Sequence, residues 1–186
     1  LNIGKDNLFK YYKNLKIGEK IPFELALNKS QYINKNQKVS DQLIADSGYG
    51  QGQILMNPVQ LASIYSAFVN NGSIYQPHIV QEQTKAWIKN VFSKETTKTI
   101  KEDLINVIAE ENGTGHAIYH DHVVLAGKTG TAQFDNSDRV HSWFIGYAPY
   151  ENPQISFCVI LEGGYTGVPG AQQVTKALLD AFFDEY

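Results

Sequence analysis

The sequence predicts an α+β fold in which helices flank a central antiparallel sheet. Helical periodicity dominates up to about residue 115, and from residue 117 the apolar pattern changes to that of strands. A helical pattern returns after Pro169-Gly170 and closes the chain. With 186 residues, of which 42% are hydrophobic, the chain is long enough for one globular core.

Three helices are expected before the sheet. The first spans residues 6–16, where Leu8, Phe9, Tyr12 and Leu15 share one side. The second follows Asn57, an N-cap, with Pro58 at the first helical position and Gln60 where a capping box places its return partner. The third begins near Ser93. The segments 28–42 and 46–52 are expected to be loops, because the first is polar and the second has three glycines in five residues.

Three strands are expected at 123–134, 142–147 and 155–161, joined by turns at 135–138 and 150–153. The runs 143–145 and 157–161 are apolar on both faces, which predicts helices on both sides of the sheet. The closing helix is expected to bury a stripe made of Val174, Leu178, Ala181 and Phe182. An average sheet has about five to six strands, and the outer two here would have free edges, so further strands are expected before residue 1.

The composition excludes several classes of protein. The formal net charge is −3 and Arg139 is the sole arginine, so no nucleic-acid partner is expected. A single cysteine, Cys158, excludes an internal disulfide framework and a multi-cysteine metal site. The sequence has no apolar run of about 18 residues and no basic-then-apolar leader, so neither a membrane span nor a signal peptide is expected within it.

The stretch AGKTGTA at 126–132 is the strongest chemical motif. One interpretation is a phosphate-binding loop, but the first glycine of that motif would fall on His122, and a strand pattern follows Lys128 where a helix is required. The other interpretation is the Lys-Thr-Gly box of serine acyltransferases that react with penicillin. There Lys128 supplies a charge for a carboxylate, and Gly130 lets a substrate lie against the backbone as an added strand.

The surrounding motifs favour the second interpretation. In the order of the family, they are SGYGQG (47–52), NPVQLASIYSA (57–67), NNG (70–72) and SWFIGYAP (142–149). Together with the Lys-Thr-Gly box they strongly resemble the penicillin-binding transpeptidases, over essentially the whole chain. The most similar members are the monofunctional, class B enzymes, and LIADSGYGQG (43–52) resembles the low-affinity, methicillin-resistance type of Gram-positive bacteria.

The resemblance implies a penicillin-binding transpeptidase or serine β-lactamase-like fold and roles for particular residues. Lys128, Thr129 and Gly130 would form the third conserved box, and Thr131 would bind the substrate carboxylate and lend its N–H to the oxyanion hole. Gln51 would border the groove, although a purely structural loop also explains that residue. The implied substrate-binding set is Lys128, Thr129, Thr131, Gln51 and Gln133.

One departure from the family pattern limits this implication. The family's nucleophile lies in Ser-x-x-Lys and its second box is Ser-x-Asn, and neither occurs in these 186 residues. In the family both precede the region matched here. Residues 1–186 are therefore expected to be the C-terminal part of one transpeptidase domain, with three of about five strands, and to be inactive and marginally stable without the upstream part.

The parent protein is expected to be a D-alanyl-D-alanine transpeptidase that cross-links peptidoglycan at the extracytoplasmic face of the cell membrane. Its expected partners are peptidoglycan stem peptides, β-lactams and the upstream part of the same protein, with no cofactor. A β-lactam sensor, a penicillin-hydrolysing relative and a non-catalytic binding module remain as alternatives.

Two further features receive a structural interpretation. His116, His120 and His122 have a spacing that a zinc site can use, but exposed histidines of a hairpin explain them better, so no metal is expected. Cys158 lies in an apolar strand and is expected to be a buried small hydrophobe rather than a reactive thiol.

Overall fold

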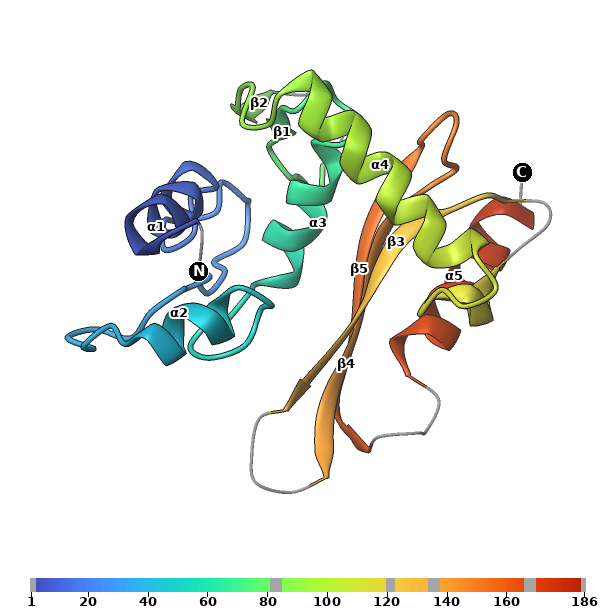
Figure 1. The fold of residues 1–186 in the computed structure, drawn as a ribbon. Helices are drawn as coiled ribbons and strands as arrows, with labels where there is room; N and C mark the ends of the chain where they lie inside the picture. Colours follow the sequence, from blue (N-terminus) through green and yellow to red (C-terminus); the bar gives the residue numbers. More distant parts are fainter. Residues whose placement is uncertain (1–2, 81–84, 120–122, 134–137, 166–169, 185–186) are drawn as a thin grey trace.

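Figure 1 shows a computed structural model of the chain, which describes residues 3–80, 85–119, 123–133, 138–165 and 170–184. Helices precede an antiparallel sheet and a last helix closes the chain, so the predicted α+β fold and element order are confirmed. The elements are α1 (Lys5–Asn14), α2 (Asp41–Ser47), α3 (Pro58–Ser66), β1 (Ile74–Tyr75), β2 (Ala86–Ile88), α4 (Lys94–Ala109), η1 (His116–Ile118), β3 (Ala126–Gln133), β4 (Arg139–Ala148), β5 (Ile155–Tyr165) and α5 (Ala171–Asp184).

The central sheet is the predicted meander, with the strand order β3-β4-β5 and both pairs antiparallel. Each strand overlaps its predicted range. The turn predicted at 135–138 lies outside the described residues except for Asp138. Because β4 is the middle strand, β3 and β5 are the two outer strands of this sheet among the described residues.

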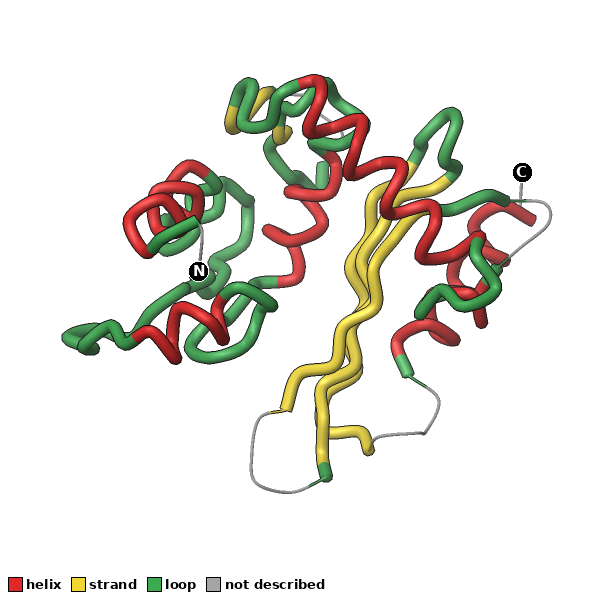
Figure 2. The backbone as a smooth tube through the Cα atoms, in the orientation of Figure 1, coloured by secondary structure: helices red, strands yellow, loops and turns green. Residues whose placement is uncertain are grey.

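The two faces of the sheet have different helical covers (Figure 2). Phe144 and Ala148 of β4 face α5 and pack with Ala171 and Leu179. Tyr147, which points to the opposite face, packs with Phe68 after α3 and with Leu104 of α4. Helix α4 contacts β3 and supplies buried residues to both clusters, through Leu104 and Ile108. Helices therefore lie on both faces, as the apolar strands predicted.

Two burial predictions were wrong in detail. The run 157–161 of β5 is half-buried along its whole length, because β5 is an outer strand of the described sheet. On α5 the buried residues are Ala171, Thr175 and Leu179, whereas the predicted stripe points outward, with Leu178 56% exposed. The helix has two adjacent stripes, and the one with smaller side chains fits against β4. The exposed stripe consists of Val174, Leu178, Ala181 and Phe182.

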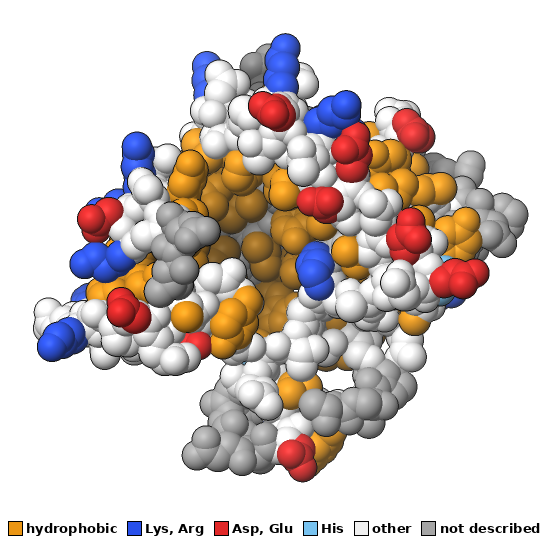
Figure 3. Space-filling model, viewed as in Figure 1, with side chains coloured by type: hydrophobic (Ala, Val, Ile, Leu, Met, Phe, Trp, Pro, Cys, Tyr) orange, Lys and Arg blue, Asp and Glu red, His pale blue; other side chains and the backbone are white. Residues whose placement is uncertain are grey.

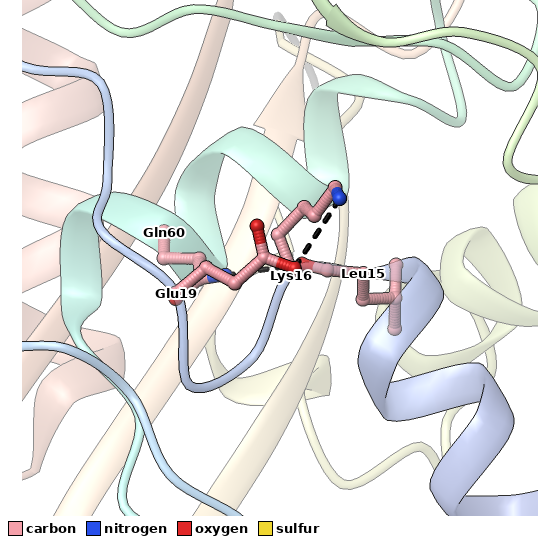
Figure 4. Close-up of polar contacts among 4 residues, drawn as sticks. All are labelled: Leu15, Lys16, Glu19 and Gln60. Atoms are coloured by element: carbon pink, nitrogen blue, oxygen red, sulfur yellow. Dashed lines mark hydrogen bonds and ion pairs between the residues drawn. The ribbon is translucent and has the colours of Figure 1, made fainter.

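The N-terminal helices meet through a buried glutamine (Figure 4). Asn57 caps α3 as predicted, because its Oδ1 accepts from the Val59 N–H at 2.9 Å. The predicted capping box was wrong. Gln60 is fully buried, and its Nε2 donates to the Leu15 carbonyl at 3.1 Å, while the Asn57 N–H donates to Ser30 Oγ. Gln60 therefore joins α3 to the end of α1.

Four short elements were missed by the sequence analysis: α2, β1, β2 and the 3-10 helix η1. Helix α2 overlaps both segments that were expected to be loops, 28–42 and 46–52. Its N-cap is Ser40, whose Oγ accepts from the Leu43 N–H. Strands β1 and β2 form a small separate sheet. Elements of two to seven residues are too short to show a hydrophobic period.

Candidate active site

The Lys-Thr-Gly box lies on β3, at one edge of the sheet. Lys128, Thr129 and Gly130 pair with Ile145, Phe144 and Trp143 of β4. No helix follows Lys128, since β3 continues to Gln133, and this excludes the phosphate-loop interpretation. β4 is the one described strand that pairs with β3. On its other side β3 therefore has the free edge that an extended peptide can join.

The side chains of the box alternate between the two faces. Lys128 and Gly130 share the face of Ile145 and Trp143, while Thr129 lies on the face of Phe144. The Lys128 side chain nevertheless folds against its own strand: Nζ donates to the Thr129 carbonyl at 3.0 Å and to Thr129 Oγ1 at 3.3 Å. Lys128 is exposed, so its charge is available to an anion beside β3.

A residue outside the box fixes Thr129. Thr129 Oγ1 donates to Thr114 Oγ1 at 2.9 Å, and the Thr114 carbonyl accepts from Gln172 Nε2 at 2.9 Å. Thr114 lies in the loop after α4, and Gln172 lies in α5. The Thr129 hydroxyl therefore links β3 to this loop, and the Thr114 carbonyl links the loop to α5. Sequence reasoning missed Thr114, since it interpreted residues 112–115 only as a helix stop.

The glycine-rich loop after α2 reaches the same strand. Gln51 Nε2 donates to the Thr131 carbonyl at 3.2 Å. Gly50 and Gly52 on either side have φ of 83° and 75°, values that side chains other than glycine rarely adopt. The Gln51 N–H also donates to the Asp46 carbonyl at 3.0 Å, which fixes the loop to α2. The loop and the box are thus brought together, as the resemblance implied.

An apolar hollow of about 350 Å³ lies between this loop, α3 and the sheet. Figure 3 shows hydrophobic side chains gathered in a hollow at the centre of this face. Its lining includes Gln51, Leu61, Tyr65, Thr131 and Trp143. Burial, together with the neighbouring Cys158, raises the pKa of Tyr65 to about 12, so its hydroxyl stays protonated near neutral pH.

One predicted substrate-binding residue lies away from this groove, and the histidines set aside as a zinc site are only partly described. Gln133 is exposed at the end of β3. Of the three histidines, His120 and His122 lie outside the described residues, and His116 Nδ1 lies 3.0 Å from the Ile108 carbonyl oxygen. Within the described ranges no group of three His, Cys, Asp or Glu side chains is placed to hold a metal ion.

Cys158 is expected to resist alkylation in the folded chain. Burial raises the pKa of its thiol from 9.0 to about 12, and the thiolate is the form that reacts. Treatment with iodoacetamide at a pH of about 8 should leave the native chain unmodified in an intact-mass measurement, whereas the chain unfolded in urea should be fully alkylated. Equal rates for the two states would contradict this prediction.

The comparisons with known proteins agree with this geometry. The family described as "Penicillin binding protein transpeptidase domain" matches residues 1–180. Penicillin-binding protein 3 of Bacillus subtilis is 34% identical over 170 residues, which cover 87% of this chain and 25% of that protein. Stage V sporulation protein D of the same organism is 32% identical over 179 residues, covering 86% of this chain and 27% of the relative.

Solved structures show the same fold. Penicillin-binding protein A from M. tuberculosis, solved as an imipenem acyl-enzyme complex, has a TM-score of 0.83 at 19% identity and is matched over 98% of this chain and 43% of its own. The D,D-transpeptidase domain of a peptidoglycan glycosyltransferase from Eggerthella lenta has a TM-score of 0.75 at 23% identity, over 99% of this chain and 49% of its own.

The fold and the Lys-Thr-Gly strand together define a penicillin-binding transpeptidase domain, and this chain belongs to that family. Within the family its relatives place it with the class B proteins. The chain spans about a quarter of the length of these curated relatives. None of the helices that the structure describes is long and apolar enough to cross a lipid bilayer.

Proposed function

We propose that this chain carries the substrate-binding strand of a serine-type D-alanyl-D-alanine transpeptidase that cross-links peptidoglycan in cell-wall synthesis. The observation that supports it most is the Lys-Thr-Gly box on a free sheet edge beside the glycine-rich loop. In this proposal Lys128 and the hydroxyls of Thr129 and Thr131 bind the substrate carboxylate, and the Thr131 N–H belongs to the oxyanion hole. Gln51 borders the groove beside this set, whereas Gln133 lies exposed at the end of β3 and is left out of it.

The proposed reaction is acyl transfer in two steps. A serine hydroxyl attacks the carbonyl of the penultimate D-alanine, and the terminal D-alanine leaves with the proton while an acyl-serine ester forms. An amine of a neighbouring stem peptide then attacks the ester, which forms the cross-link and returns a proton to the serine. β-Lactams would enter the first step as mimics of the D-alanyl-D-alanine end.

The serine itself belongs, in this proposal, to an upstream part of the same domain. These 186 residues contain no Ser-x-x-Lys and no Ser-x-Asn. Three surfaces support a missing part that packs on the chain: the apolar hollow, the outer edge of β5, and the exposed stripe on α5, where Leu178 is 56% exposed. Residues 1–186 would then be the C-terminal part of one domain. We call this chain together with that upstream part the parent transpeptidase.

Labelling with a fluorescent penicillin tests the proposal. The chain alone should acquire no covalent label, whereas the parent transpeptidase should be labelled at an upstream serine. Specific labelling of the chain alone would contradict its dependence on an upstream nucleophile. A parent protein that folds but takes no label would contradict the transpeptidase function. Rapid loss of the label would favour the penicillin-hydrolysing alternative, and a stable label without cross-linking of stem peptides would favour the sensor.

A finer proposal concerns subtype and location. The resemblance of residues 43–52 to the low-affinity, methicillin-resistance type supports a Gram-positive parent with a role in antibiotic resistance, which would be acylated slowly by methicillin in the same assay. We expect the parent to act at the extracytoplasmic face of the cell membrane, held by an anchor elsewhere in the protein. Its partners would be peptidoglycan stem peptides and β-lactams.

A further inference from the structure

The contact between Gln51 and Thr131 joins two parts of the chain that are 80 residues apart in sequence. The acceptor is a backbone carbonyl of the Lys-Thr-Gly strand, and the donor is a side-chain amide on a loop outside the sheet. A peptide that joins the free edge of β3 donates its own backbone N–H groups to carbonyls of this strand. The Gln51 amide therefore makes the type of hydrogen bond that a substrate amide would make.

The loop holds the Gln51 backbone and leaves its side chain as the part that can move. The backbone is fixed by Asp46, whose carbonyl accepts from the Gln51 N–H at 3.0 Å, and by the positive φ of Gly50 and Gly52. Asp46 is itself held, because its Oδ1 accepts from Gln42 Nε2 at 2.7 Å and from the Tyr49 hydroxyl at 2.8 Å. The hydrogen bond to Thr131, in contrast, is exposed and 3.2 Å long.

We propose that Gln51 is a positioning residue. In the substrate-free protein its carboxamide donates a hydrogen bond to the Thr131 carbonyl, and in the complex the amide N–H of the substrate replaces it as the donor. This proposal rests on the proposed transpeptidase function and adds a competition at the same site. An exposed hydrogen bond between neutral groups contributes little net free energy, so substrate can displace it. Until then the bond joins β3 to the glycine-rich loop beside the apolar hollow, whose lining includes both residues.

The competition makes a selective prediction. Ligands that carry an amide N–H to donate to Thr131 must displace Gln51, whereas ligands without that amide need not. Benzylpenicillin has an acylamino side chain, and imipenem has a hydroxyethyl group in its place. In Gln51→Ala the second-order rate constant of acylation should therefore rise for benzylpenicillin by about 2- to 10-fold, while that for imipenem changes by less than about 2-fold.

The experiment compares the ratio of these two rate constants among variants of the parent transpeptidase. Gln51→Glu is a second test variant, because a carboxylate cannot donate to a carbonyl, and the ratio should rise in it too. Gln53→Ala is the matched control. Gln53 anchors the other side of the same loop, where its Oε1 accepts from the Asn34 N–H at 2.9 Å, so this change loosens the loop without touching Thr131.

The outcomes separate competition from other roles. A fall in both rate constants in Gln51→Ala would overturn the proposal in favour of direct substrate binding, and equal changes or no change with both ligands would overturn it as well. A selective rise in Gln53→Ala would assign the effect to loop mobility and would also overturn it. If the wild-type parent is acylated by neither ligand, the transpeptidase proposal itself fails, and the competition fails with it.

Discussion

Gly146→Ala is expected to destabilise the chain by about 3 kcal/mol, at the upper end of the usual cost of overpacking. Gly146 of β4 faces Gly127 of β3. A Cβ at position 146 would overlap the Ala126 carbonyl oxygen and lie 3.0 Å from both Gly127 Cα and Phe157 Cζ. Two of these neighbours are backbone atoms, which cannot rotate away. The strands must therefore separate directly behind Lys128.

Urea denaturation followed by tryptophan fluorescence measures this loss. The measurement uses the parent transpeptidase, because residues 1–186 alone are expected to be only marginally stable. A complete domain is stable by about 5–15 kcal/mol, so a loss of about 3 kcal/mol should lower the midpoint clearly. Gly164→Ala is the matched control in the same sheet, because the nearest atom to its added Cβ is the Val140 carbonyl oxygen at 3.9 Å. We expect a change below about 0.5 kcal/mol there. Equal losses in the two variants would refute the steric explanation.

Local signals in the sequence were sufficient for the starts of two helices. Asn57 Oδ1 caps α3 and Ser93 Oγ caps α4, where it accepts from the Thr96 N–H at 3.0 Å. In both cases donor and acceptor lie within three residues of each other, so the structure depends on the local sequence alone. The meander was predicted for a similar reason, since its strands are consecutive and joined by turn-forming residues.

The failures concern choices that only tertiary packing makes. Gln60 had a helix-capping alternative, but Leu15, at the end of α1, gave its amide a partly buried carbonyl acceptor. On α5 the helical periodicity was predicted correctly but the buried face was not: Ala171, Thr175 and Leu179 are buried, whereas Leu178 of the predicted stripe is 56% exposed. Periodicity indicates that a helix has an apolar face, and the shape of the partner surface determines which face is buried.

The candidate site divides in the same way. A contiguous motif predicted the strand that carries Lys128 to Thr131. The contacts that organise it, from Thr114 to Thr129 and from Gln51 to Thr131, join residues 15 and 80 positions apart. No spacing rule relates such residues, so Thr114 was missed, and Gln51 was found only through the family resemblance.

Lys128→Ala is expected to lower the acylation rate constant of the parent transpeptidase by about 10- to 10²-fold, because a hydrogen bond to a charged group contributes about 1.5–3 kcal/mol. Lys128 is an exposed cation on the sheet edge, and its Nζ is held at 3.0 Å from the Thr129 carbonyl oxygen, beside the hydroxyl of the same residue. A ligand carboxylate there would gain a charge-assisted hydrogen bond together with hydroxyl donors. Stopped-flow measurement with a fluorescent penicillin gives the rate constant.

The penicillin methyl ester shows whether the charge of Lys128 acts on the carboxylate. If it does, esterification should slow acylation of the wild type but add little to the effect of Lys128→Ala, because the two changes remove the same interaction. Additive losses would instead place Lys128 in another role, such as holding Thr129. Lys176→Ala is the control for loss of a lysine: its Nζ pairs with Asp180 Oδ2 at 3.3 Å along α5, and we expect wild-type rates with both ligands.

Thr129→Val keeps the shape of the side chain and removes its hydroxyl. Its acylation rate constant should lie between those of the wild type and Lys128→Ala, because the Lys128 ammonium remains while one hydroxyl donor is lost.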